Sequence, residues 1–289
     1  MKILRLVLVT TIAIVLSVGT GFAQQKVRLG DNAALRYWSA FAQMQDSVIS
    51  DEQVKGLGEI LDGTAPYDDQ KYKELVEKNT PALDTMARGA ALPNCDWGIE
   101  SQMGEQAPVD YVRKALSLGR LNVLYAFHLL TIGDNEGAVR VLSIGLRFSR
   151  DLANGGTLFA TVASKSLLAG HLGAVTFALS GGRGLSSTQR SVLKKGVAQL
   201  GPDGLDWQTA MKRELEIPHA LDSQASAALA RVIPLYLGTL NSPAKLPELQ
   251  ASIASAPQAL SGIIPNPKRV LEEKQDLMNK LLHTNSLLR

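Results

Sequence analysis

Apolar residues recur every three or four positions through most of the chain, which is the spacing of amphipathic α-helices. β-Branched residues do not alternate with polar ones between hairpin turns, so strands are not expected. The pattern therefore predicts an all-α fold, an irregular array of antiparallel helices about eight to ten in number.

The first two helices have clear signals. The spacing predicts a helix over residues 32–45, with one face formed by Leu35, Trp38, Ala42 and Gln45 and with Phe41 beside it. Ser50–Gln53 is a capping box, in which the Ser side chain accepts from the third backbone N–H and the Gln reaches back. This box predicts the start of the second helix.

The third helix is expected from Asp68 or Asp69 to about Arg88, with a kink or a split near Thr80 because Pro81 interrupts the hydrogen-bond ladder. The very apolar segment 158–179 should be a central, buried helix. The remaining helices are expected over 109–132, from the turn at 133–134 to about 154, from 186 or 187 to 200, over 206–240 with Pro218 and Pro234 as breaks, near 248–255, and from 267 onwards.

The N-terminus has the three parts of a cleavable secretory signal. Lys2 and Arg5 precede an apolar run, Leu6–Val18, and Gly21–Ala23 supplies small residues before a cut ahead of Gln24. The apolar run is shorter than the roughly 20 residues of a membrane span, so cleavage is favoured over an uncleaved anchor. We expect an exported protein, periplasmic or extracellular.

The mature chain, residues 24–289, is expected to be a single helical domain, with a weak subdomain edge near 181–184. Removing Lys2 and Arg5 leaves 28 basic against 27 acidic residues, so the clustered basic face of a nucleic-acid-binding protein is not expected. No later apolar stretch is expected to span a membrane.

Metal and cofactor chemistry find little support in the sequence. Cys95 is the only cysteine, which excludes an intramolecular disulfide, and a structural zinc site needs four ligands. Glu216 and His219 form one Glu-x-x-His pair, whereas di-metal helical bundles use this pair twice. We therefore expect no metal and no cofactor.

Residues 126–145 resemble a tetratricopeptide repeat. Ala126, Gly133–Asp134, Ala138, Leu142 and Gly145 have the spacing of two antiparallel helices that cross at small residues around a tight turn. The resemblance implies a helical hairpin of the kind that binds peptides. No copy stands 34 residues earlier or later, so an ordinary helical hairpin is the alternative.

The mature chain also resembles a family of uncharacterised exported bacterial proteins. The resemblance is carried by Asn32–Phe41, by Cys95–Gly98, and by Gly133–Asp134 with Ala138. It implies an exported helical protein and transfers no catalytic residue.

The irregular segment 91–108 is the first place to look for a binding site, because long loops in compact domains are usually functional or disordered. Trp97 stands there between Asp96 and Glu100, and an aromatic face beside carboxylates can grip a sugar or a cation. In the alternative interpretation Trp97 anchors the loop to the core and Asp96 caps a turn.

His128 and Arg147 are further candidate binding residues. His128 lies in an apolar helical stretch, where a core role is the alternative. Arg140, Arg147 and Arg150 could share one helix face and bind a carboxylate, or form a solvated stripe.

These features predict a binding or scaffold protein of the cell envelope, with a protein or peptide of the envelope as its partner. Two alternatives stay open. One is a helical hydrolase of an envelope glycan or peptide that uses Asp96, Glu100 or Glu105 as acid and base. The other is a purely structural envelope protein.

Overall fold

The computed structural model describes residues 29–45, 49–99, 110–180, 184–217 and 219–289. Within these ranges the chain forms twelve α-helices, three short 3-10 helices and no strand, which confirms the all-α prediction. The α-helices are α2 (Ala33–Gln43), α3 (Asp51–Leu61), α4 (Asp69–Lys78), α5 (Thr80–Ala90), α6 (Asp110–Thr131), α7 (Asn135–Ala153), α8 (Leu158–Ser180), α9 (Ser187–Ala198), α10 (Trp207–Leu215), α11 (Ser223–Asn241), α12 (Leu246–Ala254) and α13 (Pro267–Leu287).

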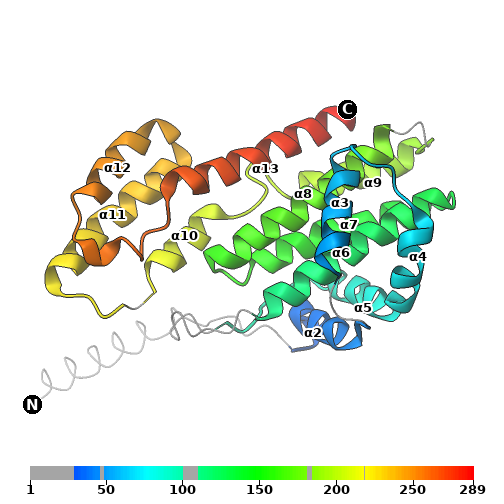
Figure 1. Cartoon of the computed structure of the whole chain (residues 1–289), viewed down its shortest axis with the longest axis horizontal. Helices are drawn as coiled ribbons and strands as arrows, with labels where there is room; N and C mark the ends of the chain where they lie inside the picture. Colours follow the sequence, from blue (N-terminus) through cyan, green and yellow to red (C-terminus); the bar gives the residue numbers. More distant parts are fainter. Residues whose placement is uncertain (1–28, 46–48, 100–109, 181–183, 218) are drawn as a thin grey trace, which may run out of the picture.

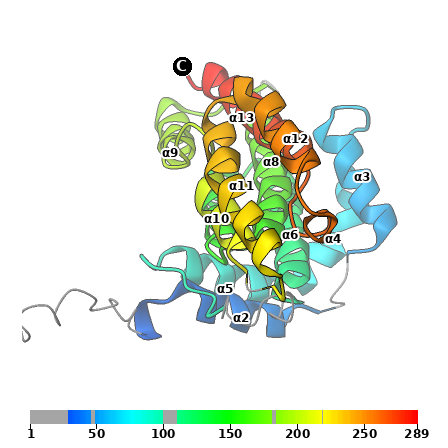
Figure 2. The same ribbon diagram turned by 90° about the vertical axis from the view of Figure 1, so that its left-hand side faces the viewer.

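The molecule is elongated, with α10, α11 and α12 at one end and α2 to α7 with α9 at the other (Figure 1). α13 runs between the two ends and packs on α8, which also contacts α6 and α7. α2 and α5 cover the side of the molecule opposite α13 (Figure 2). α7 thereby has neighbours on several sides, including α5, α6, α8 and α9.

α6 and α7 form the helical hairpin that the sequence predicts. Gly133 adopts a φ of 84° in the turn, and the Asp134 side chain caps α7 by accepting from the Gly137 N–H at 2.8 Å. Ala126 and Ala138 are fully buried, as close helix crossing requires. The hairpin is present, and its tetratricopeptide character stays a prediction.

Helix limits follow the sequence signals in most places. Ser50 and Gln53 form the expected capping box, and the third predicted helix is split at Asn79 into α4 and α5. Pro234 is the exception, because it lies inside a continuous α11 where a break was expected. Proline removes one helical hydrogen bond, but Val232 and Tyr236 on either side are buried and hold the helix together.

α2 presents an unexpected side to the core. Ala33, Ala34, Tyr37, Ala40 and Phe41 are buried, whereas Leu35 and Trp38 are 42% and 41% exposed. The small residues let α2 lie close to α5, where Tyr37 stands against a glycine of α5 that has no room for a Cβ. Leu35 and Ala42 therefore face outwards, and Trp38 lies at the edge of the aromatic cluster with part of its ring exposed.

α8 is apolar and central, as predicted, and 11 of its 23 residues are buried. By length and composition alone it could cross a membrane, so the expectation that no later stretch has this capacity needs correction. In this structure 56% of its most apolar window is buried among other helices, which is what a core helix of a folded domain also shows.

Candidate functional site

A buried carboxylate near the C-terminal end of α7 organises the end of the molecule around α2. Asp151 is fully buried, and its carboxylate accepts hydrogen bonds from the Tyr37 hydroxyl at 2.8 Å and from Arg147 Nε at 2.9 Å. Burial raises the pKa of Asp151, and the adjacent Arg147 guanidinium opposes that shift. Arg147 and Asp151 therefore form a structural ion pair within α7, and the Tyr37 hydroxyl joins α2 to it.

The loop that follows α5 is fastened to the same place. The Trp97 indole N–H donates to the Asp151 carbonyl at 2.7 Å, and Arg147 Nη2 donates to the carbonyls of Leu92 and Pro93 at 3.2 and 3.1 Å. Trp97 is only 5% exposed and stacks on Phe41 and Tyr111. These contacts favour the interpretation in which Trp97 anchors the loop.

Asp96 and Cys95 are also engaged by the fold. Asp96 accepts from the Gly98 N–H at 2.9 Å, and the Asn32 side chain binds the Asp96 backbone through both its oxygen and its nitrogen. Burial raises the pKa of the Cys95 thiol, so this cysteine is a poor nucleophile. Glu100 and Glu105 lie outside the residues that the structure describes.

His128 lies apart from this loop. Its Nδ1 is 2.7 Å from the carboxylate of Asp69, which links α6 to the start of α4, and its side chain is largely buried. The structure thus brings Trp97 and Arg147 together at Asp151, leaves the Asp96 carboxylate at the Gly98 N–H, and places His128 in a separate contact.

A polar pocket of about 810 Å³ lies between this loop, the α7–α8 connection and α10. Its charged groups are Asp96, Asp206, Arg213 and Glu214. Asp206 and Glu214 resemble Asp96 in accepting from backbone N–H groups, those of Thr209 and Leu158, at 2.9 and 3.1 Å. Asp96 and Asp206 therefore stabilise local backbone, and Glu214 of α10 binds the start of α8. The sequence pattern alone does not associate α10 with the loop.

A second, more open groove of about 930 Å³ lies on the outer side of α7, between α5 and α9. Its α5 wall is made of alanines, its α9 wall is mostly polar with Val192 as the apolar residue, and its floor is the exposed side of α7. The lining residues are Ala87, Ala90 and Ala91 from the α5 side, Glu136, Val139, Arg140, Ser143, Ile144 and Arg147 of α7, and Ser186, Thr188, Gln189, Val192 and Gln199 around α9. We call this the α5–α7–α9 groove.

The groove contains two of the three arginines that the sequence places on one face of α7. Arg140 is exposed, and Arg147 is half-buried between the groove and Asp151. The third, Arg150, donates to the carbonyl of Gln199 at 3.2 Å at the edge of the groove. Arginines on the floor beside the apolar α5 wall can bind a carboxylate-bearing segment of a protein.

A buried polar cluster lies beneath the groove, on the inner side of α7. His171 is fully buried on α8, with Nδ1 3.0 Å from the Ser149 hydroxyl and Nε2 3.1 Å from Asn122 Oδ1. Burial lowers the pKa of His171 to about 4, so the ring is neutral at neutral pH. The cluster joins α6, α7 and α8 and is closed to solvent.

No family model matches the chain, and no match to it is found among curated proteins or solved structures. The resemblances noted in the sequence therefore stay predictions.

Proposed function

We propose that the protein is an exported binding or scaffold protein of the cell envelope, which holds a segment of another protein in the α5–α7–α9 groove. The observation that carries the proposal is the open groove, with alanine and valine side chains on its walls and arginines on its floor. Exposed grooves that combine apolar surface with a few polar anchors are typical ligand sites.

Export is supported by residues 1–23, which lie outside the described part of the chain and are read from the sequence alone. Mass spectrometry of the native protein should find a mature N-terminus at or near Gln24. An intact Met1 chain recovered from the cytoplasm would contradict export.

Groove binding is tested by filling the groove. Ala90 lines it from α5, so we expect Ala90→Trp to remove capture of the partner from an envelope extract of cells that make the protein natively. Ser191→Trp, at an exposed position of α9 outside the lining, is the matched control. Equal capture by the two folded variants would exclude the groove.

The rival hydrolase would use the polar pocket, because three carboxylates line it. Each of them already accepts a hydrogen bond from a backbone N–H, which suits capping better than a free acid and base. We therefore favour a binding function over a hydrolytic one. Turnover of envelope glycans that is lost in the Glu214→Gln variant would instead favour the hydrolase.

A further inference from the structure

We infer that the occupant of the α5–α7–α9 groove is an amphipathic helix of a partner protein, with an acidic side chain that pairs with Arg140. This inference rests on the proposed function and names the chemistry of its ligand. It follows from the shape of the groove, from the residues that line it, and from the lack of a hydrogen-bond or ion-pair partner for Arg140 among the described residues.

The walls of the groove exclude two common modes of peptide binding. An added β-strand needs an exposed sheet edge, and the described residues around the groove belong to helices and their connections. A proline-rich ligand needs an aromatic-lined groove, and no aromatic residue stands among the described residues of the lining. A helix laid in a groove remains, since it satisfies its own backbone.

The dimensions and side chains suit a helix. The floor from Glu136 to Arg147 covers twelve residues of α7, and the eleven steps between them at 1.5 Å each make about 16 Å or three helical turns. The α5 wall carries only short side chains, those of Ala87, Ala90 and Ala91. Helices that pack through small residues approach each other most closely, so a ligand helix can lie close to this wall. Val192 supplies an exposed apolar contact from the opposite wall.

Arg140 supplies the charge. It makes no hydrogen bond or ion pair with any described residue, not even with Glu136 one turn earlier on α7. Arg147, in contrast, is held by Asp151 and by two loop carbonyls. The groove therefore offers one uncommitted guanidinium beside apolar surface, and a carboxylate on the edge of the ligand helix complements it.

The test is selection of helical peptides about three turns long from a displayed library, with the full mature protein as bait. Peptides whose binding is lost on Ala90→Trp are the groove binders. We expect them to carry an apolar stripe with Asp or Glu beside it, and to bind about tenfold more weakly to Arg140→Glu. Replacing that Asp or Glu by Lys in the peptide should restore binding to Arg140→Glu.

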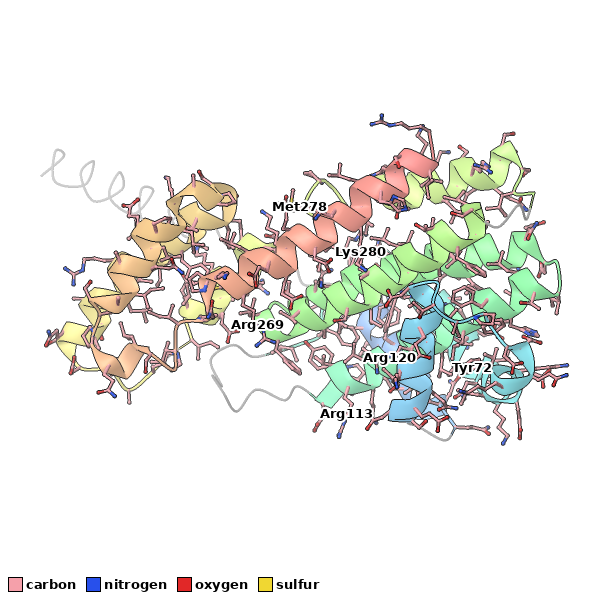
Figure 3. The ribbon with its side chains drawn as sticks, turned by 45° about the horizontal axis from the view of Figure 1, so that its top comes forward. Tyr72, Arg113, Arg120, Arg269, Met278 and Lys280 are labelled. Carbon is pink, nitrogen blue, oxygen red and sulfur yellow. The ribbon has the colours of Figure 1, made fainter. Side chains whose placement is uncertain are left out.

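Lys280→Glu is the matched control, because Lys280 is an exposed cation on α13 (Figure 3) and does not line the groove. It should leave the affinity of the selected peptides unchanged. Groove binders that contain a central proline, or that ignore the charge of residue 140, would overturn the inference and leave the proposed function standing. Failure to select any groove-dependent binder would overturn both.

Discussion

The two sides of α7 differ in how their polar groups are used. On the inner side, Ser149 lies against His171, and nearer the C-terminal end of α7 the Asp151 carboxylate is covered by α2 and binds Tyr37 and Arg147, so that these hydrogen bonds stay within the protein. On the outer side, Arg140 faces an open groove without a partner among the described residues. Buried polar groups must be satisfied within the fold, whereas an exposed cation beside apolar surface is free to bind. One helix thus serves stability on one side and, in our proposal, recognition on the other.

The largest expected effect comes from breaking the buried contacts that fasten the loop after α5 to α7. Trp97→Ala removes an indole that stacks on Phe41 and Tyr111 and donates to Asp151, and it should cost about 3–5 kcal/mol of the free energy of unfolding. Trp38→Ala removes a half-exposed indole and should cost much less. Urea unfolding of both variants checks this, and equal costs would show that Trp97 is not the anchor of the loop.

The buried His171 should make stability depend on pH. Its pKa is about 4 in the folded protein and about 6.5 in the unfolded chain, so the unfolded chain binds a proton first as the pH falls. The full stability is present above about pH 6.5, and about 3 kcal/mol is lost by about pH 4. His171→Gln, which does not titrate, should lack this part of the loss in unfolding free energies measured across the same pH range. Parallel pH profiles of the two proteins would contradict the assignment.

A smaller effect is expected where α6, α7 and α8 meet. A Cβ on Gly145 would lie 2.2 Å from the His171 ring and 2.4 Å from Asn122 Oδ1, so Gly145→Ala should destabilise the fold by about 1–3 kcal/mol. In α3, Gly58 has no neighbour within 4 Å of the added Cβ, and Gly58→Ala should stabilise it by about 0.5–1 kcal/mol. If α6, α7 and α8 pack as closely as described, thermal melting should show a lower melting temperature for Gly145→Ala and a higher one for Gly58→Ala than for the wild type.

The smallest effect on stability is expected on the outer side of α7. Arg140→Glu breaks no hydrogen bond or ion pair with a described residue, so its unfolding free energy should stay within about 0.5 kcal/mol of the wild type. Chemical denaturation measures this. A cost of several kcal/mol would mean that Arg140 supports the fold, and the difference between the two sides of α7 would disappear.

Local signals predicted much of the fold and little of the candidate site. The capping box at Ser50, the split near Thr80 and the turn at Gly133 each depend on a few neighbouring residues, and each is present in the structure. The outward face of Leu35 and Trp38 was not foreseen, because a helical period shows which residues share a face and not what covers it. The groove joins α5, α7 and α9, and only tertiary packing brings these segments together.

The loop after α5 illustrates the same limit. Its irregular composition was visible in the sequence, but its hydrogen bonds reach Asn32 and Asp151, which lie more than fifty residues away along the chain. Such long-range contacts decide whether a tryptophan anchors a loop or meets a ligand. The arginine face of α7 was visible from spacing alone, and only the structure shows that Arg147 turns to the core while Arg140 stays exposed.

The central claim is that the outer side of α7 is the binding surface, and site-specific photo-crosslinking in native cells tests it most directly. A photoreactive side chain at Ser143, on the floor of the groove, should give a discrete crosslinked partner, whereas the same group at Ser191, on the exposed side of α9, should give none. Crosslinking from Ser191 but not from Ser143, or from neither position, would contradict the account.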